Sequence, residues 1–416
     1  MELDANKTNT HNQKEEIMKR FLTVLMILLL AASLFGCSKP ETEPTGNGGD
    51  EPQDTGKDNK SGLNPDSALA NAVDASTGKY DIIMLIPSVA SVDDKGSMET
   101  QIQGIRKYCQ EHGWTYTYVQ TNEDSAETFE ALAAAAVAAG VQFIGCATAQ
   151  VAQGAYALQY DYPEMGMYII NEEPIDPTGE IKHEEPNMAA MIFREEQASF
   201  LGGYAAVMEG YRKLGFLGGM AVAAVVRFGY GFVQGAEAAA RDLGLEPGEV
   251  EVKFAYTNNF EANPDNQALA ASWYQDGTEV ICACGGAMGT SGMADAEQND
   301  GWVIGVDTDQ SYQSDRVITS CMKDTGAAAY LAIDTWFNDK ANFPGGRLTK
   351  LGCAEGGVKL PTETWSMKNF TVADYQALYD RLAKDEDGLA SSLYVDTDFA
   401  TAAELPVEYV TVIDLE

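Results

Sequence analysis

The sequence predicts an α/β protein made of two lobes, each built around a parallel sheet. Short apolar runs alternate with segments of helical spacing from residue 79 onward. Such alternation is typical of a parallel sheet that helices cover on both faces. The series stops near residue 171 and begins again near residue 214. Two successive α/β units in one chain indicate two lobes, and the cleft between them is the expected ligand site.

The first unit begins with a buried strand. Residues 80–86 form a short apolar run that ends at Pro87. Runs of this kind predict strands, whereas apolar residues at helical spacing that stop at a glycine predict helices. The expected elements that follow are a helix at 97–112, a strand at 114–120, a helix at 127–139, a strand at 141–146, a helix at 150–160 and a strand at 167–171.

The second unit repeats this pattern. Its expected elements are strands at 214–219, 250–256, 279–284, 302–307 and 317–321, and helices at 227–243, 266–275, 288–298 and 326–339. Gly286 opens a glycine-rich turn into one of these helices. The turn lacks the glycine spacing of a dinucleotide-binding loop and the Gly-Lys-Ser/Thr of a phosphate loop. We therefore expect close backbone approach to a ligand, or tight packing, at Gly286.

The N-terminal region carries a targeting signal. Residues 18–37 have a positive start, an apolar stretch, small residues and a final Cys37, which is the layout of a secretory signal peptide. The ending at 34–37 resembles a bacterial lipobox, in which Cys37 is lipidated, although Phe35 stands where a small residue is usual. The alternative is a membrane-spanning helix, for which the apolar stretch is short. Acyl chains on Cys37 would hold the protein at the outer face of the cell membrane.

Two flanking segments are expected to lie outside the folded lobes. Residues 1–17 precede the positive start and are interpreted as an upstream extension. Residues 38–78 are mostly polar and contain Pro and Gly, with Leu63 as the first aliphatic residue after Cys37. Such a segment cannot bury a core, so we expect a flexible tether.

Composition excludes several classes of partner. The chain has 63 acidic and 27 basic residues, a formal net charge of −36, with no basic cluster to offset it. Nucleic acid and anionic membrane surfaces would be repelled. The three histidines make a His-rich metal site implausible. We expect no metal, no cofactor and no nucleic-acid partner. The cysteines beyond Cys37 show no disulfide framework, and we expect mostly reduced, buried thiols.

Polar residues follow two of the predicted strands in the second unit. The segment 305–310 places Asp307, Asp309 and an amide directly after a buried strand. Ligands of open α/β sheets bind beyond the carboxyl ends of the strands, where a carboxylate can accept two hydrogen bonds from a ribose diol. The alternative for Asp307 is a turn cap. Lys323 follows the next strand and can share a hydroxyl with Asp307, form an ion pair, or be a solvated surface lysine.

Other features bear on binding and catalysis. Phe260 follows the strand at 250–256 and can stack on a planar ligand, or be a core residue. No Gly-x-Ser-x-Gly motif is present, and neither His112 nor His183 has an evident orienting partner. The pair Asp307 and Asp309 can be considered for glycoside hydrolysis. We expect binding without catalysis.

A series of motifs, in order along the chain, resembles a known family. The motifs lie at 91–95, 200–206, 214–219, 227–232, 283–286, 302–310 and 319–323. Together they resemble the basic membrane protein family of ABC-transporter substrate-binding lipoproteins, which includes bacterial purine nucleoside receptors. The resemblance runs from about Tyr80 to the C-terminus. It implies a type I periplasmic-binding-protein fold, with two Rossmann-like lobes joined by three crossovers.

The resemblance also implies lobe boundaries and a ligand. Residues 79–195 with 320–350 would form the first lobe, and 196–319 with 351–416 the second. In nucleoside-binding members, the positions of Asp307 and Lys323 hold the ribose hydroxyls, and an aromatic residue in the region of Phe260 stacks on the base.

The base side of the site departs from the family pattern. The family usually has Ser-Phe-Asn where this chain has Gly-Ser-Met at 96–98, and an acidic residue where this chain has Asn171. Met98 can still pack on a ring, and Asn171 or Asp94 can hydrogen-bond base edges.

The sequence therefore predicts a lipid-anchored, monomeric solute-binding protein. It would capture a nucleoside between its lobes and deliver it to an ABC permease. Two alternatives stay open: a surface receptor that signals through a partner, and, less favoured, a surface nucleosidase or glycosidase.

Overall fold

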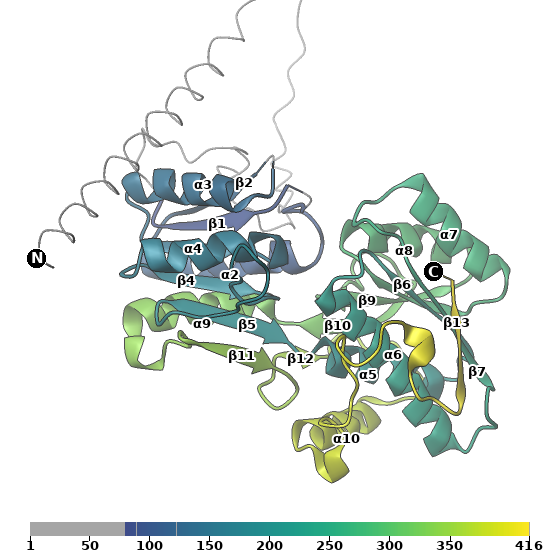
Figure 1. Cartoon of the computed structure of the whole chain (residues 1–416). Coiled ribbons are helices and arrows are strands. Elements are labelled where there is room, and N and C mark those ends of the chain that lie inside the picture. Colours follow the sequence, from purple (N-terminus) through teal and green to yellow (C-terminus); the bar gives the residue numbers. More distant parts are fainter. Residues whose placement is uncertain (1–79, 89, 122, 416) are drawn as a thin grey trace, which may run out of the picture. The chain divides into compact units, whose positions relative to one another are not determined.

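The described part of the chain contains two parallel sheets. The computed structural model describes residues 80–88, 90–121 and 123–415. The expected extension at 1–17, signal peptide with Cys37 and tether at 38–78 lie outside these residues. Each sheet is flanked by helices (Figure 1). Within the described ranges, no helix combines the length and the apolar character that crossing a membrane requires.

The first sheet has six parallel strands in the order β11-β5-β4-β3-β1-β2. In chain order these are β1 (Ile82–Ile86), β2 (Tyr116–Gln120), β3 (Phe143–Cys146), β4 (Gly166–Ile170), β5 (Met188–Phe193) and β11 (Arg347–Leu351). Strand order reverses beside β1, because β2 lies on one side of it and β3 on the other. Crevices at such reversals are the usual ligand sites of open α/β sheets.

The second sheet repeats this order with seven strands, β12-β10-β9-β8-β6-β7-β13. They are β6 (Lys213–Gly218), β7 (Val250–Tyr256), β8 (Val280–Cys284), β9 (Trp302–Asp307), β10 (Val317–Lys323), β12 (Val358–Lys359) and β13 (Val410–Asp414). All neighbours are parallel except β12, which pairs antiparallel with β10. The reversal beside β6 matches the one beside β1, so each lobe presents a crevice of the same kind.

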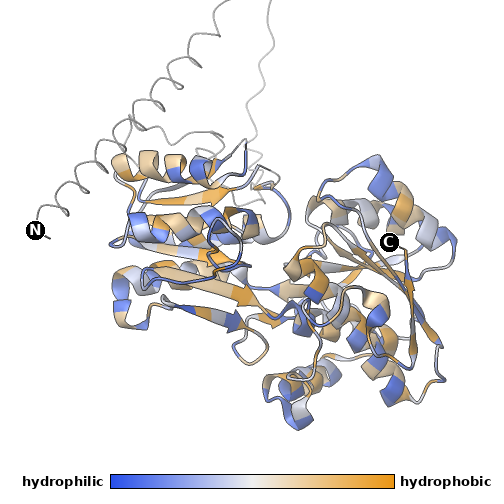
Figure 2. Cartoon of the chain, in the orientation of Figure 1, coloured by the Kyte–Doolittle hydropathy of each residue, from blue (hydrophilic) through white to orange (hydrophobic). Residues whose placement is uncertain are grey.

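Helices cover both faces of each sheet. The first sheet is flanked by α2 (Ser97–His112), α3 (Ala126–Ala138), α4 (Ala152–Asp161) and α9 (Thr325–Asn338), and the second by α5 (Glu195–Glu209), α6 (Ala223–Leu243), α7 (Pro264–Gln275) and α8 (Ala287–Asn299); α10 (Val372–Ala383) packs on α5. Alternate residues of β1 belong to different cores, with Met84 in one and Leu85 in another. Most residues of the inner strands are accordingly hydrophobic (Figure 2), as expected for parallel strands buried on both faces. Charged residues occur in β7 and in the edge strand β11.

The chain passes between the two sheets three times within the described residues. It does so after β5, after β10 and after β11. Strand β10 pairs with β9 as far as Met322 and with β12 at Lys323. The chain therefore leaves the second sheet about four residues later than the expected boundary before Ser320, because hydrogen bonding to both neighbours extends β10.

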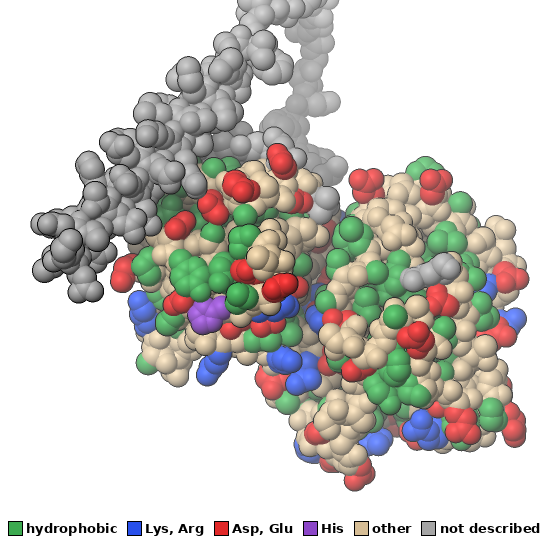
Figure 3. Space-filling model, in the orientation of Figure 1, with side chains coloured by type: hydrophobic (Ala, Val, Ile, Leu, Met, Phe, Trp, Pro, Cys, Tyr) green, Lys and Arg blue, Asp and Glu red, His purple; other side chains and the backbone are tan. Residues whose placement is uncertain are grey.

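Acidic side chains are spread over the face seen in Figure 3 and do not form a single patch.

Candidate ligand-binding site

A cavity of about 680 Å³ lies between the carboxyl ends of the two sheets' strands. The seven residues that the sequence predicts to bind the ligand all line this cavity: Asp94, Met98, Asn171, Phe260, Gly286, Asp307 and Lys323. Three of them follow strands of the first sheet, and the others follow or end strands of the second. The topology thus brings together residues that are more than 200 positions apart in the sequence.

The loop after β1 supplies a carboxylate that caps α2. Asp94 Oδ1 accepts hydrogen bonds from the N–H groups of Gly96 at 2.8 Å and Glu99 at 3.2 Å, and Oδ2 accepts one from Met98 at 3.1 Å. These N–H groups have no partner within the helix, so the carboxylate satisfies them. Burial nevertheless raises the pKa of Asp94 to about 6, and repulsion from Asp307 adds to the rise.

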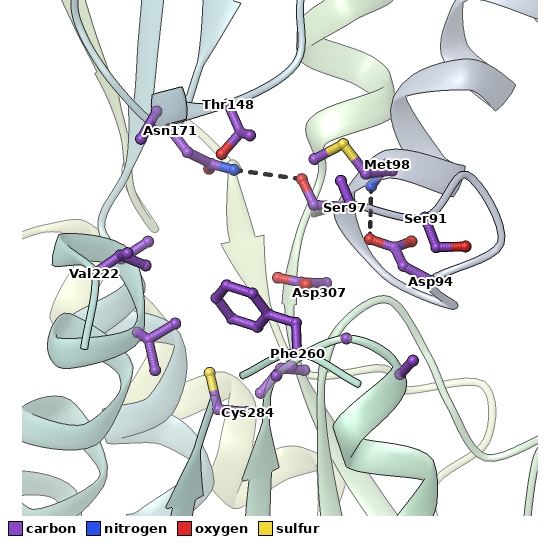
Figure 4. Close-up of a pocket in the computed structure, with 18 of the residues that line it drawn as sticks. Ser91, Asp94, Ser97, Met98, Thr148, Asn171, Val222, Phe260, Cys284 and Asp307 are labelled. Carbon is purple, nitrogen blue, oxygen red and sulfur yellow. Dashed lines mark hydrogen bonds between the residues drawn. The ribbon is translucent and has the colours of Figure 1, made fainter. Parts of the chain in front are cut away.

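The end of β4 supplies an unpaired acceptor. Asn171 has a left-handed backbone with φ 68°. Its amide Nδ2 donates to Ser97 Oγ at 3.4 Å (Figure 4), while its Oδ1 is buried without a hydrogen-bond partner. A buried amide oxygen of this kind favours a ligand that donates a hydrogen bond. Met98, which follows Ser97 in α2, is 5% exposed and contributes apolar surface to the cavity.

The ends of β9 and β10 form an ion pair at the opposite wall. Lys323 Nζ lies 3.3 Å from Asp307 Oδ1 and 3.3 Å from Glu195 Oε1. Lys323 is 5% exposed, so the surface-lysine alternative is wrong. Burial alone would lower the pKa of Lys323, but Asp307 and Glu195 together raise it above its usual value. The lysine is therefore a positively charged donor at the cavity wall.

A second ion pair lies behind the first. Glu195 Oε2 accepts from Arg227 Nε at 2.7 Å, and Arg227 Nη1 lies 3.1 Å from Asp396 Oδ1. Glu195 is the first residue of α5 and is fully buried. It holds Lys323 and Arg227 together, and was not anticipated from the sequence. Arg227 opens one of the family motifs, which is the only sequence signal that pointed to it.

An aromatic ring and a glycine turn complete the second lobe's wall. Phe260 is half-buried and its ring projects into the cavity beside Asp307 (Figure 4). A Cβ on Gly219 would lie 2.5 Å from this ring, so the ring packs directly on backbone. Gly286 has φ 54° and precedes α8. The nearest atom to a Cβ placed at Gly286 would be in the Asp94 side chain, at 3.7 Å, which is an ordinary contact. The position therefore requires glycine because of its backbone conformation and not because of crowding.

Several other residues considered from the sequence lie elsewhere. Asp309 does not line the cavity; it accepts from the Ser311 N–H at 3.0 Å and from the Thr364 hydroxyl at 2.7 Å. His112 and His183 are also absent from the cavity wall. In the described part of the chain, no group of three or more His, Cys, Asp or Glu side chains is arranged to hold a metal ion. The six cysteines in these residues are free and buried.

The polar lining also contains residues that the sequence did not single out for binding. These are Ser88, Ser91, Ser97, Thr148, Gln150, Glu172 and Glu261. The cavity combines donors and acceptors at its two walls with the Phe260 ring and aliphatic side chains of α6. This arrangement suits a small polar molecule that contains a planar ring.

Comparison with known proteins places the chain in a family. The family model described as ABC transporter substrate-binding protein PnrA-like matches residues 79–394. The chain belongs to this family. Members capture a solute for an ABC transporter, and the predicted resemblance is thereby confirmed.

Individual relatives agree with this assignment. Basic membrane protein B of Borreliella burgdorferi is 32% identical over 214 residues, which are 49% of this chain and 60% of that protein. The ABC transporter nucleoside-binding protein BmpA of Lactococcus lactis is 25% identical over 299 residues, 66% of this chain and 80% of that protein. An ABC transporter solute-binding protein of Aeropyrum pernix matches with a TM-score of 0.63 at 18% identity, over 73% of this chain and 92% of that one. This last likeness shows the shared fold.

Proposed function

We propose that the protein captures a nucleoside in the cavity between its lobes and delivers it to an ABC permease. The observation that carries the proposal is the pairing of Asp307 and Lys323 beside the Phe260 ring. A carboxylate and an ammonium group can respectively accept from and donate to the two hydroxyls of a ribose. The ring supplies a stacking surface for the base, and the Asn171 oxygen an acceptor for its edge.

The same proposal includes the membrane attachment of the protein and its partners. Acyl chains on Cys37 would hold a monomer at the outer face of the cell membrane, with the tether at 38–78 giving it reach toward the permease. The strong negative charge of the chain argues against nucleic acid as a partner. A surface receptor that signals through a partner would bind its ligand in the same way. Loss of nucleoside uptake on gene deletion supports transport; unchanged uptake supports the receptor.

We further propose that the protein performs no chemistry on its ligand. A glycosidase needs two carboxylates flanking the scissile bond. The pair considered from the sequence does not flank the cavity, because Asp307 is paired with Lys323 and Asp309 lies outside it. Asp94, which faces Asp307, already accepts three backbone N–H groups at the start of α2. Inosine or guanosine should therefore be recovered unchanged after prolonged incubation with the protein. Release of a free base would overturn this part of the proposal.

A thermal-shift screen tests the ligand class. The chain from Ser38 onward would be heated with nucleosides, free bases, sugars and nucleoside monophosphates. A ligand at 100 times its dissociation constant adds about 2.7 kcal/mol to the free energy of unfolding, which is readily detected. Nucleosides should raise the unfolding temperature more than free bases. Monophosphates should have little effect, because Glu172 and Glu261 add negative charge to the cavity wall.

Asp307→Ala is the sharpest substitution at this site. It leaves the ribose hydroxyls buried without an acceptor, so we expect nucleoside binding to weaken by about 2–3 kcal/mol, roughly 30- to 150-fold. Isothermal titration calorimetry measures the change. Asp309→Ala is the matched control, because this neighbouring carboxylate lies outside the cavity and should leave affinity unchanged. Equal affinity in the Asp307 variant and the wild type would refute the assigned role.

A further inference from the structure

Gln310 is a buried amide close to the sugar-side wall. It lies three residues beyond Asp307 and is 2% exposed. Its side-chain Oε1 accepts a hydrogen bond from the Val306 backbone N–H at 3.1 Å. The backbone N–H of Gln310 donates to Ser320 Oγ at 3.0 Å. A Cβ on Gly305 would lie 2.4 Å from Gln310 Oε1, so this glycine makes room for the amide. These contacts fix Gln310 within the second lobe.

The other end of the amide reaches the first lobe. Gln310 Nε2 donates to the Lys95 carbonyl at 3.0 Å. Because the Val306 N–H can only donate, it must face the amide oxygen, and this fixes which end of the amide faces Lys95. The Lys95 carbonyl belongs to the loop between β1 and α2, whereas Gln310 belongs to the loop between β9 and β10. The hydrogen bond therefore crosses the cleft.

The loop that receives this bond carries the base-side wall. Asp94 fixes the loop through its three bonds to the start of α2, and Lys95 has a left-handed φ of 54°. A Cβ on Gly96 would lie 2.9 Å from Asp307 Oδ2, so the two walls approach each other closely at this point. A displacement of this loop would move Met98, and with it the base-side wall, relative to Asp307.

We propose that Gln310 is a cross-cleft latch, a positioning residue whose bond to the Lys95 carbonyl holds the lobes closed over the ligand. The proposal rests on the proposed function, because it assumes that the lobes close on a nucleoside. When the lobes part, both groups are exposed to water and the bond is lost. A neutral hydrogen bond of this kind shifts an equilibrium by about two- to tenfold. The latch therefore slows ligand release without itself contacting the ligand; Gln310 is absent from the cavity lining.

Gln310→Glu isolates the cross-cleft contact. Glutamate keeps an oxygen for the Val306 N–H but presents a second oxygen to the Lys95 carbonyl. At pH 8, we expect the nucleoside dissociation rate to rise about fivefold or more relative to wild type, with the association rate little changed. At lower pH, a protonated carboxyl can donate to the Lys95 carbonyl, so the ratio to wild type should fall. Gln310→Met should raise the dissociation rate at every pH.

The matched control is Gln313→Glu. Gln313 lies on the same loop, and its Nε2 has no hydrogen-bond partner. This variant adds the same charge on the same loop at an amide nitrogen that has no hydrogen bond to lose, so its dissociation rate should equal that of the wild type. A pH-independent ratio in Gln310→Glu, or rates equal to those of Gln313→Glu, would overturn the proposal.

Small-angle X-ray scattering supplies a readout that needs no ligand. Ligand-free Gln310→Glu at pH 8 should have a larger radius of gyration than wild type and Gln313→Glu, because its lobes separate more often. If no nucleoside binds the wild type, the proposed function fails and scattering alone decides the latch. Identical scattering from all of these proteins would then overturn the latch as well.

Discussion

Two carboxylates face each other across the cleft. Asp94 comes from the loop after β1, and Asp307 ends β9. Three backbone N–H groups donate hydrogen bonds to Asp94 and stabilise its charged form. Burial outweighs these bonds and raises the pKa of Asp94 to about 6. Asp307 contributes to that rise by repulsion. Asp94 therefore changes its charge near pH 6.

Nucleoside affinity should depend on pH through Asp94. If the charged carboxylate accepts a hydrogen bond from the base, protonation removes that acceptor, so affinity falls as the pH drops below about 6. With a free-protein pKa near 6, affinity should fall about tenfold between neutral pH and pH 5. Calorimetry over this range measures the profile.

Asp94→Asn is the control for this pH dependence. Asparagine keeps an oxygen that can cap α2 but cannot titrate. Its affinity should be nearly constant between pH 5 and neutral pH. The same pH dependence in Asp94→Asn and wild type would assign the titration to another group.

The residues of the site were predictable to the extent that they follow strands. Asp307, Lys323 and Phe260 come directly after or at the end of apolar runs, and parallel strands deliver such residues to one edge. Glu195 was not predicted, because it begins a helix and reaches Lys323 only through the tertiary fold. The sequence also left open whether Lys323 is a surface residue. Its distances to two carboxylates decide that question.

At the scale of elements, α5 and α6 pack backbone against backbone. A Cβ on Gly203 would lie 2.1 Å from the Phe232 carbonyl oxygen, and one on Gly235 would lie 2.1 Å from that of Phe200. Neither neighbour is a flexible side chain, so neither can move aside. This close packing fixes the start of α5, and with it Glu195, beneath the ligand cavity.

Gly235→Ala should destabilise the protein despite favouring the helix. Alanine gains about 1 kcal/mol over glycine in a helix interior. The contact with the Phe200 carbonyl forces the two helices apart, however, and overpacking of this kind typically costs about 1–3 kcal/mol or more. We expect a net loss in the free energy of unfolding, measured by denaturant titration.

Gly292→Ala in α8 provides the comparison. A Cβ at Gly292 would meet only the Ala283 Cβ, at 3.5 Å, which is ordinary contact. The gain in helix propensity should then dominate and leave the protein as stable as wild type or more so. If both alanine variants are equally stable, the close approach of α5 and α6 does not constrain the fold.

The elements that the sequence predicted well are those with a clear period. The structure confirms the expected limits of α2, β7 and β9. Helix α5 has no expected counterpart because it is buried on nearly all sides, which removes the amphipathic pattern. Strands β5, β11, β12 and β13 and helix α10 were also missed. Pairing with distant strands, and not local sequence, defines β11, β12 and β13.

At the scale of the whole described region, the crossings between sheets coincide with the charged wall of the cavity. Lys323 is the last residue of β10 before one crossing, and Glu195 is the first residue of α5 after another. Their ion pair joins two crossing segments at 3.3 Å. The segments about which the lobes would move therefore carry charges of the candidate site. The resemblance predicted three crossings, but only the structure shows that this ion pair links two of them.

The net charge of the molecule should make its stability depend on salt. Acidic residues outnumber basic ones by 63 to 27, so folding brings many like charges together. Raising the ionic strength from about 0.01 M to 0.15 M shortens the screening length from about 30 Å to about 8 Å, which weakens this repulsion. Buried pairs such as Lys323–Glu195 are screened much less, so they lose little of their attraction. We therefore expect the unfolding temperature of the ligand-free protein to rise by a few degrees with sodium chloride over this range, measured by differential scanning fluorimetry. A fall would mean that attractive ion pairs at the surface outweigh the repulsion.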